Sequence, residues 1–153
     1  MVTSGFVFAD AFAYTISDDP TGGDCSTIGT WDSGSKTCSI TSDITSQVIV
    51  NANGITLDGT GKTFYPNVGT GGKFISIDTV SNIIIQNFNL VGDTNNQGIN
   101  IKNADDIIIK QNTFSDFGYG LSATNYVSNF RQSLCTSISD GKNKSIRKRL
   151  SIR

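Results

Sequence analysis

The chain of 153 residues has no histidine and no glutamate, and it contains only two prolines and one tryptophan. Without histidine, every Ser-His or Cys-His catalytic arrangement is excluded, and the commonest transition-metal ligand is missing. All 13 acidic residues are aspartate, which favours turns, whereas glutamate favours helices. The composition therefore favours strands and turns over a helical bundle, and it leaves carboxylates, lysine, arginine and tyrosine for any chemistry.

Basic residues are scarce in most of the chain and concentrated at its end. The formal net charge is −1, but residues 1–130 hold five lysines, no arginine and twelve aspartates, a balance of −7. Residues 131–153 hold seven basic residues and one aspartate, a balance of +6. The small net charge therefore conceals an acidic body and a basic tail.

Cysteine is also rare, with three in the chain. Cys25 and Cys38 flank a loop rich in Gly, Ser and Thr, and no second cysteine pair is present to complete a zinc ribbon. We favour a disulfide between them over a metal site, and closing a loop of this size would contribute roughly 3 kcal/mol. Because such bonds persist in oxidising compartments, we expect an extracellular or cell-surface location. Cys135 is left without a predicted partner.

Long apolar runs are absent, and none is long enough to span a bilayer. Residues 1–13 contain a short apolar stretch, with small residues at Ala9, Ala11 and Ala13 that would frame a cleavage site, but they lack a basic start. Two interpretations stay open for this segment. It is either the remainder of a secretory signal, which we favour, or an apolar cap strand.

The chain does contain an internal repeat, because the sequence aligns with itself at an offset of 24. The aligned segments are residues 75–77 with 99–101, residues 82–85 with 106–109, and residue 90 with 114. Apolar and polar residues alternate within each copy, which is typical of strands, and no stretch has helical spacing. A fixed period of this length indicates stacked coils that bury a shared apolar face.

One copy is long enough for a single triangular coil of three short strands. In the clearest copy, the residues predicted to point inward are Ile75, Ile77, Ile83, Ile85, Phe88 and Leu90. Residues 120–125 repeat the pattern of residues 98–103, and then the pattern fails. We therefore predict an all-β solenoid of about three coils whose last coil is an unpaired strand edge, available for self-association.

Three motifs carry a resemblance to a known family: Gly54-Ile-Thr-Leu-Asp-Gly-Thr-Gly61, Asn82-Ile-Ile-Ile-Gln-Asn-Phe88 and Asp106-Ile-Ile-Ile-Lys-Gln-Asn-Thr-Phe114. They resemble the repeats of the right-handed, single-stranded parallel β-helix of the pectate-lyase-like superfamily. The opening segment resembles secreted, archaeal-type β-helix proteins of unassigned function. The resemblance covers residues 14–125, which we predict to be one β-helix domain with a disulfide-linked leading loop. It is specific for fold rather than function, because the superfamily includes lyases, hydrolases, epimerases and adhesins.

Pectate and polygalacturonate enzymes of that superfamily carry aspartates on an outward strand face, either with calcium and a basic residue or near a histidine. Asp105 and Asp106 superficially resemble such a carboxylate pair. They align, however, with Ser81 and Asn82 in a turn, and aspartate suits turns because its side chain bonds to nearby backbone. We therefore favour a turn role for both aspartates over a catalytic one.

The period also places charged side chains next to each other on neighbouring coils. It predicts Asp78 beside Lys102, and Asp58 near Gln86 and Lys110. Because the charges alternate in sign, we favour ladder pairs that stabilise an exposed surface over a calcium site. Together with the two adjacent aspartates, these charged residues are the candidates for surface binding. No catalytic residue, metal ligand or cofactor is assigned.

Residues 126–153 leave the strand pattern, and two interpretations stay open. In the first, they form a basic arm that binds nucleic acid or another anionic polymer. In the second, the repeat array was cut short, for example by a shifted reading frame, and these residues are the unrelated sequence that follows it. We favour the second interpretation, because a nucleic-acid arm is unexpected on an exported, disulfide-containing body. It predicts a poorly packed or disordered tail.

Three functional hypotheses follow. The first is a non-catalytic extracellular or cell-surface module that contacts polysaccharide or other surface components. The second is a fragment of a polysaccharide lyase or hydrolase whose active coils are missing, and the third is binding of anionic polymers through the tail. The absence of histidine, and of arginine in the repeat body, favours the first hypothesis.

Overall fold

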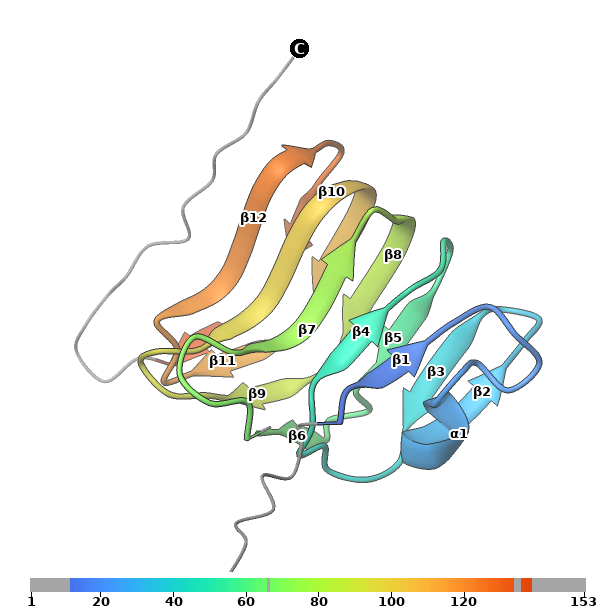
Figure 1. The fold of residues 1–153 in the computed structure, drawn as a ribbon, viewed down its shortest axis with the longest axis horizontal. Helices are drawn as coiled ribbons and strands as arrows, with labels where there is room; N and C mark the ends of the chain where they lie inside the picture. The colour runs from blue at the N-terminus through green and yellow to red at the C-terminus, as the bar shows by residue number, and fades with distance from the viewer. Residues whose placement is uncertain (1–11, 66, 134–135, 139–153) are drawn as a thin grey trace, which may run out of the picture.

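The chain folds into a β-solenoid in which short strands stack in parallel through about four turns (Figure 1). This architecture comes from a computed structural model that describes residues 12–65, 67–133 and 136–138. Within those ranges, α1 (Cys25–Ile28) is the one helix and the other elements are strands. The all-β fold predicted from the alternating pattern is therefore confirmed.

The strands form three faces, which we name A, B and C. Face A contains β1 (Tyr14–Ile16), β4 (Val48–Val50), β7 (Lys73–Asp78), the first half of β10 (Gln97–Lys110) and β12 (Tyr119–Val127). Face B contains β2 (Gly29–Asp32), β3 (Thr37–Ile40), β5 (Thr56–Asp58), β8 (Ser81–Gln86), the second half of β10 and β13 (Arg131–Ser133). Face C contains β6 (Thr63–Phe64), β9 (Asn89–Val91), β11 (Thr113–Ser115) and β14 (Thr136–Ile138).

The offset of 24 is the register between two neighbouring coils. Ile75 pairs with Ile99 on face A, and Leu90 pairs with Phe114 on face C. Other coils differ in length, since Tyr14 pairs with Val48 and Gln97 with Tyr119, offsets of 34 and 22. Corner loops can lengthen without disturbing the pairing of the strands, so these coils leave no constant period in the sequence. For this reason the sequence indicated about three coils where the structure has about four turns.

The apolar core runs through the middle of the solenoid. The six residues predicted to point inward are all buried: Ile75, Ile77, Ile83, Ile85, Phe88 and Leu90. Phenylalanines pack together in the same core, where the ring of Phe74 lies 4.7 Å from that of Phe117 and 5.4 Å from that of Phe64. Each fully buried side chain of this size contributes roughly 1.5–3 kcal/mol. Stacking of coils therefore supplies the stability that one coil lacks.

Asn112 is a polar residue inside this core, at the corner between β10 and β11. Its side chain is 1% exposed. Its Oδ1 accepts a hydrogen bond from the backbone N–H of Phe88 at 2.9 Å, and its Nδ2 donates to the carbonyl of Ile85 at 3.0 Å. The amide thus ties two coils together through backbone groups that the corner would otherwise leave unpaired.

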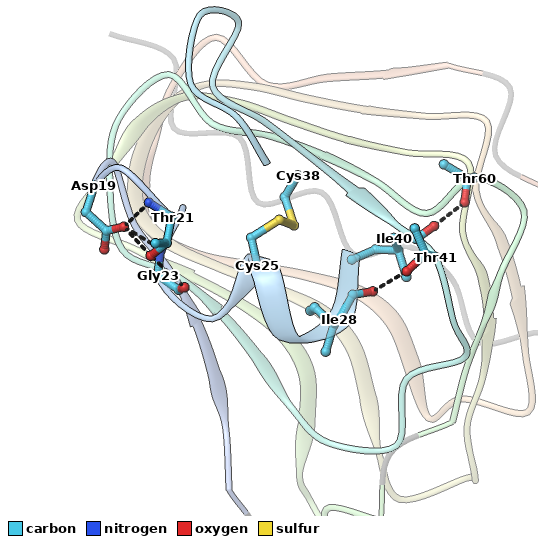
Figure 2. The surroundings of a disulfide bond; sticks show 9 residues. All are labelled: Asp19, Thr21, Gly23, Cys25, Ile28, Cys38, Ile40, Thr41 and Thr60. Atoms are coloured by element: carbon cyan, nitrogen blue, oxygen red, sulfur yellow. Dashed lines mark hydrogen bonds between the residues drawn. A yellow bond between two sulfur atoms is a disulfide. The ribbon is translucent and has the colours of Figure 1, made fainter. Parts of the chain in front are cut away.

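The N-terminal end of the solenoid is closed by an irregular segment. Cys25 in α1 and Cys38 in β3 form the predicted disulfide, with a Cα–Cα distance of 5.8 Å (Figure 2). The strand β2 lies outside β3 and pairs with it antiparallel, which ends the parallel stack on face B. No sequence pattern predicted this hairpin.

A tight loop beside the helix supports the same end. Asp19 accepts hydrogen bonds from the backbone N–H groups of Thr21 and Gly23, at 2.8 and 3.0 Å (Figure 2). Hydrogen bonds from the Gly23 backbone, from Ser17 and from Thr21 hold the pKa of the Asp19 carboxyl far below its usual range. Gly22 lies against the indole of Trp31, where a Cβ would come within 2.4 Å of the ring, and its φ of +71° suits glycine.

The C-terminal end continues the parallel stack past Asn125, where the repeat was predicted to end. β12 extends to Val127, β13 pairs with β10, and β14 pairs with β11. Three parts of the chain that were discussed above lie outside the described residues: residues 1–11, Cys135 and residues 139–153. The last of these ranges contains most of the predicted basic tail. In the part of the chain that the structure describes, no helix is long and apolar enough to cross a membrane.

Candidate functional site

The corner between faces A and B carries two columns of residues with positive φ. One column is Thr79, Asn103 and Asn125, and the other is Asn82, Asp106 and Asn129. Asn and Asp tolerate the left-handed conformation better than other residues that bear a Cβ. These short polar residues therefore bend each coil from one face to the next and gather polar side chains along the corner.

A hollow of about 370 Å³ lies along this corner, and we call it the corner hollow. Polar side chains from successive coils line much of it, among them Asn53, Thr79, Asn103, Asp105 and Ser128. Asn53 is fixed by its Oδ1, which accepts a hydrogen bond from the backbone N–H of Ser81 at 2.8 Å. The hollow is thus a groove with amide, hydroxyl and carboxylate groups on its walls.

Tyr126 also lines the corner hollow, and its side chain is 85% exposed. It belongs to β12, which pairs with the first half of β10 through an irregularity near Lys102 and Ala104. The repeat pattern does not identify this residue, because it lies after Asn125, beyond the last copy of the repeat. An isolated tyrosine in a polar segment, Asn125-Tyr-Val-Ser-Asn129, was the available signal.

The predicted pair of Asp78 and Lys102 borders the same corner. The two residues are in register on β7 and β10, and the Lys102 Nζ lies 3.7 Å from the Asp78 carboxylate. Asp78 also accepts hydrogen bonds from the hydroxyl of Thr79 and from Asn103 Nδ2, at 2.9 and 3.1 Å. The Thr79 hydrogen bond, then Asn103 and the charge of Lys102, lower the pKa of the Asp78 carboxyl despite its partial desolvation.

Asp105 and Asp106 are adjacent in β10 but serve different surfaces. Asp105 lines the corner hollow, where it accepts hydrogen bonds from the hydroxyl of Ser128 and from Asn129 Nδ2. Asp106 has a φ of 52° and lines a second hollow on face B. The two residues therefore face different hollows.

The second predicted cluster lies on face B. Asp58, Gln86 and Lys110 are in register on β5, β8 and β10. Gln86 Nε2 donates to Asp58 at 2.7 Å, and Asn87 Nδ2 donates to the same carboxylate at 2.9 Å. Burial raises the pKa of Asp58, but hydrogen bonds from Asn87, Thr60 and Gln86, with the charge of Lys110, outweigh burial and lower it. The structure therefore brings these side chains together as a ladder.

Among residues 12–65, 67–133 and 136–138, no three His, Cys, Asp or Glu side chains gather as metal ligands would. Comparison with known proteins adds no further assignment, since no family model, no curated protein and no solved structure matches this chain.

Proposed function

We propose that this protein is a non-catalytic extracellular module that binds a carbohydrate chain in the corner hollow. In this proposal the solenoid is a right-handed parallel β-helix of the pectate-lyase-like type. The Cys25–Cys38 disulfide supports an exported protein, because such bonds persist in oxidising compartments.

The exposed ring of Tyr126 among the amide and carboxylate groups of the corner hollow is the observation that carries the proposal. A sugar ring has an apolar face of C–H groups and a rim of hydroxyls. An exposed aromatic ring offers a flat apolar surface with a polar tip, and amides and carboxylates offer hydrogen-bond partners for hydroxyls. Asn53, Asn103 and Asp105 supply such groups next to Tyr126.

The binding test is affinity electrophoresis through gels that contain hydroxyethylcellulose, galactomannan, arabinoxylan or polygalacturonate. We expect at least one polysaccharide to retard the protein. The variant Tyr126→Ala should lose affinity by about tenfold, which corresponds to about 1.4 kcal/mol, whereas Tyr126→Phe should keep most of it.

Tyr119→Ala is the matched control, because Tyr119 lies on the same strand, is 51% exposed and does not line the corner hollow. It should bind as the wild type does. Failure of all four polysaccharides to retard the protein, or an equal loss in Tyr119→Ala, would overturn the proposal. Release of new reducing ends during incubation would overturn its non-catalytic part.

A further inference from the structure

The outward side of face B carries a second hollow, separate from the one that contains Tyr126. We call it the face-B hollow, and its volume is about 400 Å³. Its lining residues are Asn82, Ile84, Asp106, Ile108, Asn129 and Arg131. A volume of this order is typical of sites for small molecules.

The floor of the face-B hollow is apolar. Ile84 and Ile108 are paired in register on β8 and β10. Both side chains point outward and are half-buried. Outward positions of the neighbouring columns are polar or charged, as on Asp58, Gln86 and Lys110. Two adjacent isoleucines on an otherwise polar face therefore form a small apolar patch that a ligand would cover.

Two opposite charges flank this floor without being paired. Asp106 and Arg131 are exposed, and within the described ranges neither side chain takes part in an ion pair or hydrogen bond. Asp58, on the same face, is by contrast held by hydrogen bonds from Gln86 and Asn87. The charges of Asp106 and Arg131 are thus available to a ligand.

The register places these two residues close together on face B. Arg131 is directly opposite Ile108, and Ile108 is two residues beyond Asp106 on β10. Asp106 and Arg131 are therefore diagonal neighbours, with Cα atoms roughly 7–8 Å apart. A ligand that satisfies both must carry a cationic group and an anionic group at a comparable separation.

We propose that the face-B hollow binds a short zwitterionic peptide, of the size of a dipeptide with aliphatic side chains. Its ammonium group pairs with Asp106, and its carboxylate accepts two hydrogen bonds from the Arg131 guanidinium. Its aliphatic side chains cover Ile84 and Ile108. An extended dipeptide spans about 7 Å at roughly 3.3–3.6 Å per residue, which is comparable to the separation of the two Cα atoms.

Titration with L-valyl-L-valine, followed by NMR of the Ile84 and Ile108 methyl groups, tests this proposal. We expect saturable shifts of both methyl groups at millimolar concentrations. N-acetylation or C-amidation of the dipeptide should each weaken binding by about fivefold or more, because each removes one of the two charges. Absence of saturable shifts would overturn the proposal.

Two variants assign the charges to their partners. Arg131→Gln should weaken binding of the free dipeptide and leave that of the C-amidated form unchanged. Asp106→Asn should weaken binding of the free dipeptide and leave that of the N-acetylated form unchanged. Equal binding by wild type and either variant would overturn the assignment.

The matched controls are Lys110→Gln, which alters a charge on face B outside the hollow, and Tyr126→Ala. Both should bind the dipeptide as the wild type does. The carbohydrate and dipeptide tests therefore fail or succeed independently, since Tyr126 belongs to the other hollow. Loss of dipeptide binding in Tyr126→Ala would place the ligand in the corner hollow and overturn the proposal.

Discussion

The two ends of the solenoid are built in different ways. The N-terminal end is closed by a disulfide, a short helix and an antiparallel strand, and Cys25, Ile28 and Cys38 are buried there. The C-terminal end continues the regular stack, and no described strand pairs with the outer edge of β12. A repeat can therefore propagate a stack but cannot end one, because ending it requires residues that depart from the repeat.

A consequence for stability follows from this contrast. Each coil is stabilised mainly by its neighbours, so a coil with one neighbour is expected to open more readily than a coil with two. The disulfide offsets this loss at the N-terminal end, and nothing described offsets it at the C-terminal end.

The first prediction compares a core residue of a middle coil with one of the last described coil. Ile85 is 0% exposed and Leu121 is 6% exposed. We expect Ile85→Ala to lower the free energy of unfolding by about 2–5 kcal/mol, because it leaves a cavity between packed coils. Leu121→Ala should cost less, since its coil relaxes more easily. Denaturant unfolding measures both, and an equal or larger loss in Leu121→Ala would contradict the comparison.

The second prediction concerns the closure of the N-terminal end. Replacing both Cys25 and Cys38 by alanine should lower the free energy of unfolding by about 2–4 kcal/mol, because the open loop gains entropy in the unfolded chain. Thermal unfolding with and without a reductant measures this effect. The reductant should lower the Tm of the wild type and leave that of the double variant unchanged; an unchanged wild-type Tm would show that the disulfide does not hold this end.

The third prediction concerns the contact that links the inner coils. Asn112→Ala should cost about 1–3 kcal/mol, because it leaves the Phe88 N–H and the Ile85 carbonyl buried without partners. Hydrogen exchange should become faster in β11 and β12 and stay slow in β3. Asn100→Ala is the control, since Asn100 is also buried but, among the described residues, its side-chain amide bonds only to Gln97. Faster exchange in β3 than in β12 would contradict the prediction.

The fourth and smallest effect is a pH dependence of the N-terminal loop. The Asp19 carboxyl has a lowered pKa in the folded chain, so its stabilising effect is present above the unfolded pKa of about 3.9. It is lost as pH falls from there through the folded pKa. Amide exchange of Thr21 and Gly23, corrected for its intrinsic pH dependence, should show faster opening in acid. Asp19→Asn should abolish this change, and a persistent change would assign it to another group.

Much of the fold was predictable because the stacked coils carry a local signal. Alternation along β7 and β8 identified the inward residues, and the offset of 24 placed Asp78 beside Lys102. The disulfide was predictable because no other cysteine lies near the loop. The hairpin of β2 and β3 was not predictable, because this antiparallel pairing occurs once and so leaves no repeat in the sequence.

The candidate site was less predictable than the fold. Asp105 and Asp106 appeared as a pair because they are adjacent in sequence, but the positive φ of Asp106 separates them between two hollows. Tyr126 and Arg131 lie in a coil whose length differs from the 24-residue period. Aligning the copies of the repeat therefore could not predict which residues they lie beside. Sites formed at corners depend on loop geometry, which a strand pattern does not encode.

The position of Trp31 has a practical consequence. It is the one tryptophan of the chain and lies in the hairpin of the closed end, against Gly22. Tryptophan fluorescence therefore reports on that end alone, whereas tyrosine emission comes also from Tyr119 and Tyr126 at the other end. The molecule thus carries an optical probe specific to its closed end, which can be followed during unfolding without any label.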